Sequence, residues 1–241
     1  IKEKPINGNR IVWRYLSLEK FLDLLLNSEI FFTNLTKLTD KYEGTIFQSN
    51  LRMANSAIKD NPSYKKKKAE ITREHNRVNN LRNYTLVNCW TLKKHESFAL
   101  WKIYVGTNPG VAIRTTVSKL RQSINKMDQE FDENISMAKV KYQDRLDESF
   151  SRIEATITKK KFYDFESEMR LMVFNSPPNE DEAPYDIEVG RKFNINPKIL
   201  LNELYISPFI SEPYRKTIIN TVTKLAPFLE ERIKESEIND S

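Results

Sequence analysis

Cysteine, histidine and glycine are scarce in this sequence, and their scarcity excludes several kinds of site. The 241 residues include one cysteine, Cys89, so no disulfide can form within the chain. His75 and His95 are the only histidines, which leaves too few soft ligands for a tetrahedral zinc site. Five glycines, with no GxGxxG and no GxxxxGK[ST], argue against a glycine-rich phosphate loop, and no GxSxG nucleophile elbow is present.

Long apolar runs and a strong excess of one charge are also missing. No run approaches the ~18–20 residues that a membrane-spanning helix needs, and the first residues shown are polar and charged, unlike a signal peptide. With a single cysteine, this predicts a cytoplasmic protein with no membrane partner. The net charge of +6 comes from 39 Lys and Arg against 33 Asp and Glu. This modest excess favours anionic partners or simply solubility.

The distribution of apolar residues predicts one α+β domain over residues 1–241, with a mixed or antiparallel sheet. Strands are expected at 10–16, 30–33, 84–91, 110–116, 137–142, 167–174, 185–195 and 203–206. A helix capped by Ser17 is expected to follow it, with others at 97–104 (helix or turn), 117–127 and 147–161. A last helix is expected from Pro213, with Ile218, Ile219, Val222 and Leu225 on its buried side. Residues 46–83 are predicted to be an insertion of two polar helices, 46–60 and 64–82, the second of them strongly basic.

Glu166 and Glu168 form the most informative pattern in the chain. They lie two residues apart at the start of the expected strand 167–174, so their side chains should point the same way, with Met169, Leu171 and Val173 on the other face. Arg170 comes next on that face and can hold one carboxylate ionised, while repulsion and burial raise the pKa of the other. The other interpretation, and the commoner one for such a pair alone, is an exposed edge strand with a ladder of charges.

Arg14 and the segment 97–104 hold further candidates. Arg14 lies between Trp13 and Tyr15, which suits phosphate or ribose contacts but equally fits a snorkelling arginine at the edge of the core. Ser97, Trp101 and Tyr104 offer a hydroxyl and two rings that could enclose a flat ligand. Aromatic residues at this helical spacing belong more often to a core.

Two further patterns favour structural roles. Asp40 and Glu43 form a D-x-x-E in a polar loop, where capping of a helix by Asp40 is favoured over metal binding. Cys89 lies within the apolar run 86–90 and is expected to be a buried, inert thiol. A nucleophilic pair of Cys89 and His95 is the alternative.

Taken in order, these motifs resemble the bacterial family catalogued as domain of unknown function 2971, over about residues 12–210. The matching pieces are Arg14-Tyr15-Leu16-Ser17, Phe31-Phe32-Thr33-Asn34, Asp40-x-x-Glu43, Leu100-Trp101-x-x-Tyr104, Gly110-Val111-Ala112-Ile113 and Tyr163-x-Phe165-Glu166-x-Glu168-x-Arg170-Leu171. Two features depart from the family: Lys41 and Tyr42 replace a proline–aromatic pair, and the insertion 46–83 is unusually basic.

The layout of that family is similar to the ADP-ribosyltransferase superfamily, which places an Arg or His on the first core strand and a Glu on a late strand. The resemblance implies NAD⁺ as the substrate and no metal. It assigns Glu168 to the donor ribose and Glu166 to the acceptor. The cofactor-binding residues that it implies are Arg14, Tyr15, Ser97, Trp101, Tyr104 and Arg170.

Three hypotheses follow from the sequence. The first is an NAD⁺-consuming transferase or glycohydrolase, a toxin or anti-phage defence effector that modifies nucleic acid or protein and answers to a regulatory partner. The second is a non-catalytic module that binds nucleic acid through the basic segment 64–82. The third and weakest is a Mg²⁺-dependent nuclease with Asp40, Glu43, Glu166 and Glu168 as ligands.

Overall fold

The computed structural model describes residues 6–39, 43–44, 56, 64–125, 135–143, 151–177 and 189–239. Asp40, Lys41 and Tyr42 lie outside the described residues, as do the expected helix 46–60 apart from Ser56 and the first part of the expected strand 185–195. None of the helices in the described ranges is long and apolar enough to cross a membrane.

The fold is α+β, with a mixed and mostly antiparallel sheet, as the sequence predicts. The described strands run in the order β11 (Ile233–Lys234), β10 (Glu203–Ile206), β4 (Gly110–Thr116), β1 (Ile11–Ser17), β3 (Thr85–Thr91), β2 (Glu29–Asn34) and β9 (Gly190–Asn194). β8 (Glu168–Phe174) also pairs with β3, and β5 (Ile135–Lys139) pairs with β8. Only β10 and β11 run parallel among these pairs. β6 (Lys141–Tyr142) and β7 (Thr158–Lys159) form a small separate parallel pair.

Strand β3 has different partners along its two edges. On one edge it pairs with β8 over its whole length, from Thr85 to Thr91. On the other edge β2 pairs with Leu86 and Val87, and β1 pairs with Thr91 alone. The residues between these pairings, 88–90, have no strand partner on that edge within the described residues. The sheet is therefore split between β1 and β2.

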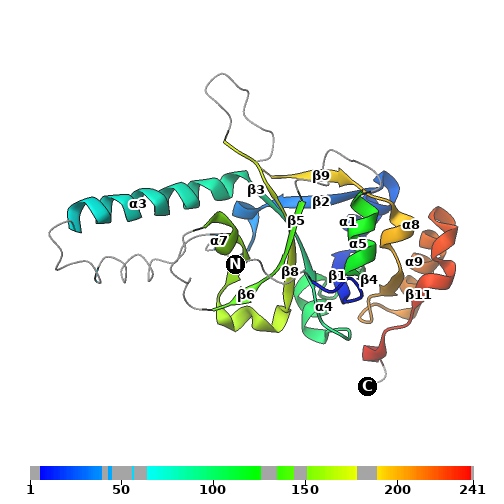
Figure 1. The fold of residues 1–241 in the computed structure, drawn as a ribbon. Coiled ribbons are helices and arrows are strands. Elements are labelled where there is room, and N and C mark those ends of the chain that lie inside the picture. The colour runs from blue at the N-terminus through cyan, green and yellow to red at the C-terminus, as the bar shows by residue number, and fades with distance from the viewer. Residues whose placement is uncertain are drawn as a thin grey trace.

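The main helices are α1 (Leu18–Asn27), α3 (Tyr64–Leu81), α4 (Phe98–Tyr104), α5 (Val117–Asn125), α7 (Arg152–Ile157), α8 (Pro197–Leu200) and α9 (Glu212–Leu225). Single 3₁₀ turns are η1 (Leu35–Lys37), η2 (Arg82–Tyr84), η3 (Lys161–Glu166), η4 (Pro227–Arg232) and η5 (Glu237–Asn239). α3 projects from the body of the molecule, on the side away from α8 and α9 (Figure 1). This confirms the predicted basic helix at 64–82.

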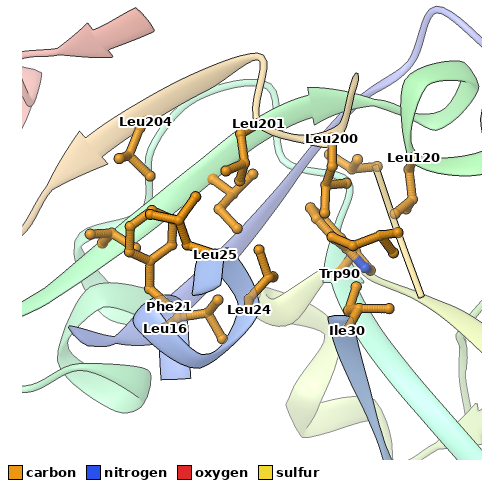
Figure 2. Close-up of a cluster of buried hydrophobic side chains, with 14 of the residues drawn as sticks. Leu16, Phe21, Leu24, Leu25, Ile30, Trp90, Leu120, Leu200, Leu201 and Leu204 are labelled. Atoms are coloured by element: carbon orange, nitrogen blue, oxygen red, sulfur yellow. The ribbon is translucent and has the colours of Figure 1, made fainter. Parts of the chain in front are cut away.

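The largest core cluster joins the sheet to α1, α5, α8 and α9 (Figure 2). α1 buries Phe21, Leu24 and Leu25 because these positions fall on one face at helical spacing. From β8 the cluster takes Met169, Leu171 and Val173, and the alternation of a strand directs Glu168 and Arg170 to the opposite face. The predicted two faces of this strand are thus confirmed.

Three local predictions are wrong. Within the described residues, the expected helix 147–161 is helical only as α7, after which the β-branched Thr158 is extended and forms β7 with Lys159. Ser17 occupies the N-cap position of α1, but its hydroxyl donates to Glu19 Oε1 at 2.5 Å and caps no backbone group. Leu225, expected on the buried side of the last helix, is exposed because the helix ends there.

Candidate functional site

A cavity of about 580 Å³ lies at the split between β1 and β2. Five successive residues of β1, 13–17, line it, and so do neighbouring residues of β2 and β3. Since successive strand residues point to opposite faces, the cavity reaches both faces of the sheet through the split. Its volume is within the range of small-molecule sites, roughly 300–1,000 Å³.

Five of the eight candidate residues line this cavity: Arg14, Tyr15, Tyr104, Glu166 and Glu168. They come from β1, α4, η3 and β8, so the fold brings together segments that are far apart in the sequence. The convergence of an arginine, two phenol rings and two carboxylates on one cavity makes it the candidate site.

Ser97, Trp101 and Arg170 do not line the cavity and instead support the residues that do. The Ser97 backbone N–H donates to the Tyr15 hydroxyl at 2.9 Å, and the Ser97 side chain caps α4. Trp101 is buried against Tyr15, with ring centroids 5.0 Å apart. Arg170 lies behind Glu168 with no exposed surface. None of the three is placed to touch a ligand in the cavity directly.

Arg14 is an unusual lining residue because it is partly buried and has no bonded anion among the described residues. Its Nη1 atom is shut off from solvent and makes no hydrogen bond within the described residues. The guanidinium carbon lies 5.8 Å from the Trp90 ring centroid, and burial lowers the pKa of Arg14 to about 10. A desolvated donor without an acceptor destabilises the empty site. A ligand oxygen that accepts a hydrogen bond from this donor would remove that cost and so bind more tightly.

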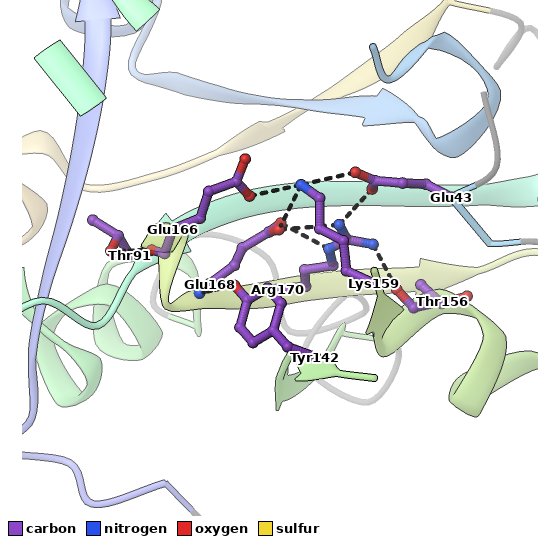
Figure 3. A network of polar contacts seen from close by, with 8 residues as sticks. All are labelled: Glu43, Thr91, Tyr142, Thr156, Lys159, Glu166, Glu168 and Arg170. Atoms are coloured by element: carbon purple, nitrogen blue, oxygen red, sulfur yellow. Dashed lines mark hydrogen bonds and ion pairs between the residues drawn. The ribbon is translucent and has the colours of Figure 1, made fainter. Parts of the chain in front are cut away.

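The two carboxylates of the pair belong to a buried charged cluster of Glu43, Lys159, Glu166, Glu168 and Arg170 (Figure 3). Lys159 Nζ lies 2.6 Å from Glu166 Oε2, 2.9 Å from Glu43 Oε1 and 3.5 Å from Glu168 Oε2. Arg170 Nε donates to Glu168 Oε1 at 2.7 Å, and its Nη2 contacts Glu43 and Glu168 Oε2. Three carboxylates against two cations leave the cluster with one excess negative charge.

The two glutamates of the pair differ in how many of their oxygens are occupied. Both oxygens of Glu168 are bound to cationic groups, whereas Glu166 uses only Oε2 within the described residues (Figure 3). Burial alone would raise the pKa of Glu168, but Arg170 and Lys159 together lower it to about 2. Burial, opposed by Lys159, raises the pKa of Glu166. Glu168 is thus a fixed negative charge, and Glu166 is the carboxyl suited to exchange a proton.

The backbone around the pair is held in a sharp turn. Ser167 has a left-handed conformation, φ 48° and ψ 50°, so Glu166 ends η3 and only Glu168 lies on the strand. Thr91 Oγ1 donates to the Glu166 carbonyl at 2.5 Å, and the Glu168 N–H donates to the Tyr142 hydroxyl at 2.6 Å. The prediction that both glutamates share a strand face is wrong, yet the turn still brings both carboxylates to Lys159.

The edge-strand interpretation of the pair is also wrong. β8 lies between β3 and β5, and Glu166 and Glu168 are 7% and 6% exposed. The charges therefore balance one another inside the protein and do not form a surface ladder. Lys159 and Tyr142 were missed as members of this site, and Glu43 was grouped with Glu166 and Glu168 only as a metal ligand. Lys159 was assigned to the expected charged helix 147–161, where nothing distinguished it from its lysine neighbours.

Three of the four predicted metal ligands, Glu43, Glu166 and Glu168, meet in this cluster, but around cations of the protein itself. Lys159 and Arg170 form ion pairs with the two oxygens of Glu43, and Arg170 also pairs with Glu168. These oxygens are therefore already bound by cationic side chains. Among the described residues no group of three His, Cys, Asp or Glu could hold a metal ion, and Asp40 lies outside that part of the chain.

Cys89 is only partly buried and lines the cavity. Burial, together with the charge of Glu168, raises the pKa of its thiol well above the ordinary value. His95 is exposed in the loop that follows β3. The thiol is thus protonated and, as predicted, not activated as a nucleophile.

Acid is expected to destabilise the fold as Glu168 takes up a proton. The pKa of Glu168 is about 2 in the folded protein against an ordinary 4.5, so the unfolded chain binds that proton more readily. Ionised Glu168 contributes roughly 3 kcal/mol above pH 4.5, and this contribution is lost as the pH falls towards 2. Glu166, with its raised pKa, acts in the opposite sense as the pH rises.

Urea unfolding at a series of pH values measures this effect. The Glu168→Gln variant should lose stability less steeply below pH 4.5, because the titrating group has been removed. An unchanged acid slope in the variant would contradict the assignment.

Fold and site together define an α+β protein whose split sheet encloses a cavity, with a buried charged cluster beside it. Comparison with protein-family models, curated proteins and solved structures found no match to this chain.

Proposed function

We propose that the protein consumes NAD⁺, as an ADP-ribosyltransferase or an NAD⁺ glycohydrolase, and that its fold belongs with those enzymes. One observation carries the proposal: Arg14, Tyr104 and Glu168, separate in sequence, line a single cavity. Their order resembles the Arg, aromatic or Ser, and Glu order of ADP-ribosyltransferases, and the wider set of motifs resembles domain of unknown function 2971.

Glu168 supplies the charge that this reaction needs. Cleavage of the nicotinamide–ribose bond passes through an oxocarbenium-like state, in which positive charge develops on the ribose. A carboxylate that is already ionised and fixed stabilises that charge with little reorganisation. Arg170 and Lys159 hold Glu168 in this way, and the lone pairs that remain on its oxygens can accept a ribose hydroxyl.

Glu166 supplies the proton acceptor. Its Oε1 is free among the described residues, while Oε2 is held 2.6 Å from Lys159 Nζ. A raised pKa brings a carboxyl closer to the range in which a general base works at neutral pH. In transfer it would deprotonate the acceptor, and in hydrolysis it would deprotonate water.

Arg14 and the two phenols supply ligand binding. The unpartnered Nη1 of Arg14 would donate to a phosphate or ribose oxygen. Tyr15 and Tyr104 present rings on which nicotinamide can pack. Burial, together with the charge of Glu96, raises the pKa of Tyr15, and burial with Glu166 and Glu168 raises that of Tyr104, so both rings stay neutral phenols.

Incubation with NAD⁺ labelled in the nicotinamide ring tests the proposal. The wild-type protein should release labelled nicotinamide, and the Arg14→Gln variant should need at least tenfold more NAD⁺ for half-maximal release. Because the Nη1 atom of Arg14 is buried and unpaired, the same substitution should not destabilise the empty protein and is expected to raise its unfolding midpoint.

Arg77→Gln, on the exposed face of α3, is the matched control and should change neither quantity. The proposal would be contradicted if the wild-type protein released no nicotinamide, either with or without candidate acceptors. A drop in stability of Arg14→Gln would show that Arg14 is structural.

The projection of α3 favours a second candidate, the non-catalytic binding of nucleic acid. This helix extends away from the body (Figure 1), and Lys66, Arg73 and Arg77 are exposed along it. Charge reversal of Lys66 and Arg73 should then abolish nucleic-acid binding, while Glu168→Gln leaves that binding unchanged.

A further inference from the structure

Two segments beside the cavity interleave lysines with exposed aromatic rings. They are residues 93–104 (KKHESFALWKIY) and 160–165 (KKFYDF). Within them Phe98 is 57%, Tyr104 51% and Phe162 69% exposed. Rings of this size on the surface mark interaction sites when they cluster.

The two segments form one surface. The loop that begins the first segment is bonded to the end of η3, through Leu92 N–H to the Ser167 carbonyl at 2.8 Å. The Thr91 hydroxyl makes a parallel bond to the Glu166 carbonyl at 2.5 Å. Tyr104, at the end of the first segment, and Glu166, directly after the second, line the same cavity.

The charge of this lysine–aromatic surface selects an anionic partner. Lys94 and Lys161 are exposed, one in each segment, and Lys93 and Lys160 precede them with partial exposure. Lys102 lies 3.6 Å over the Phe209 ring and 5.5 Å from Phe98, so its ammonium group stands among the rings. Rings that stack on flat bases, with lysines between them for phosphates, are the two parts of a single-strand binding site.

We propose that the lysine–aromatic surface binds single-stranded nucleic acid and presents it to the cavity as the acceptor. The inference rests on the proposed function, since it names the acceptor of the same site. A duplex fits less well because its bases are stacked inside and cannot reach the rings. α3 is basic, but its sequence carries only Tyr64 as an aromatic residue, so it lacks the stacking part.

In the group transfer, a hydroxyl or amine of the strand attacks C1′ of the nicotinamide ribose. The bond from C1′ to the nicotinamide nitrogen breaks, and its electron pair leaves with neutral nicotinamide. The proton of the attacking group passes to Glu166 Oε1. The products are the ADP-ribosylated strand, nicotinamide and one proton.

Fluorescence anisotropy with labelled single-stranded DNA, single-stranded RNA and duplex DNA tests the surface. Single strands should bind more tightly than duplex, and log affinity should fall with log salt at a slope of about −3, as for four to five phosphate contacts. The Phe162→Ala variant should bind roughly tenfold more weakly, and Lys94→Glu/Lys161→Glu should lose most of the affinity.

Two charge-matched controls locate the site. Lys216→Glu/Lys224→Glu on α9, exposed and outside both segments, should bind strands as the wild type does. Lys66→Glu/Arg73→Glu reverses the same charge on α3, and strand binding lost only there would overturn the inference. Binding to vesicles of anionic phospholipid but to no oligonucleotide would overturn it as well.

Activity separates this inference from the proposed function. Lys94→Glu/Lys161→Glu should release nicotinamide in water at the wild-type rate and fail to label a strand. A protein that releases nicotinamide but binds no single strand contradicts the surface and leaves the NAD⁺ reaction standing. Strand binding at this surface without nicotinamide release contradicts the NAD⁺ reaction, and with it the acceptor role.

Discussion

Replacing Glu168 with glutamine is expected to lower the rate of nicotinamide release about 10²–10³-fold, with a much smaller change in KM. The physical reason is the fixed negative charge: Glu168 has a pKa of about 2 and is held on both oxygens, so it stabilises a charge that exists only in the transition state. Glutamine keeps the shape of the side chain and removes the charge.

Glu166→Gln should give a different pattern. Because Glu166 is assigned to the acceptor, its loss should slow transfer by about 10²–10⁴-fold and remove the lower limb of the pH–rate profile. Glu168→Gln should retain that limb. Steady-state rates from pH 4 to 9, with and without a single-stranded acceptor, separate the two roles.

Glu74→Gln is a suitable control, since this glutamate pairs with Arg77 on the surface of α3 far from the cavity. Unfolding midpoints of all three variants should be measured beside the rates. Wild-type activity in Glu168→Gln would remove the basis for the transferase proposal. Identical pH profiles for the two cluster variants would contradict the division of roles.

The second large effect is on stability. Arg170→Met is expected to destabilise the fold by about 3–5 kcal/mol, the usual cost of breaking a buried ion pair from one side. Arg170 has no exposed surface, and its Nη1 also donates to the Thr156 carbonyl at 2.6 Å. Without Arg170, the single positive charge of Lys159 would have to balance the three carboxylates of Glu43, Glu166 and Glu168.

A double variant shows whether charge is the cause. Arg170→Met/Glu43→Leu restores the excess of one negative charge that the cluster has in the wild type, and should recover part of the lost stability. Arg77→Met, which removes an exposed arginine, should leave the unfolding midpoint unchanged. Urea unfolding at pH 7 measures all three. A loss below about 1 kcal/mol in Arg170→Met would mean that the cluster is not a structural centre.

Periodicity made much of the fold predictable from the sequence. The strands 110–116 and 203–206 match β4 and β10, and the alternation of Met169, Leu171 and Val173 with Glu168 and Arg170 correctly assigned the two faces of β8. Such patterns are local, because each residue's side of a strand depends only on its neighbours in the chain.

Long-range contacts were much less predictable. Lys159 looked like an ordinary helix charge, and nothing in its local sequence reveals that it shares a buried cluster with Glu43. The left-handed turn at Ser167 was also missed, since serine gives no glycine-like signal for a positive φ.

By itself, the sequence determined the composition of the site: few thiols, imidazoles and glycines, and therefore a chemistry of carboxylates, arginines and aromatic rings. The scarcity of cysteine and glycine decides this at once, because residue type sets what a side chain can donate, accept or ligate. Only the tertiary structure decided which of those groups act together. The divergence of β1 and β2 opens the cavity, and pairing of β3 with β8 brings Glu168 to it across about 150 residues of chain from Arg14. That placement depends on strand pairing between distant segments, which residue type and local spacing do not encode.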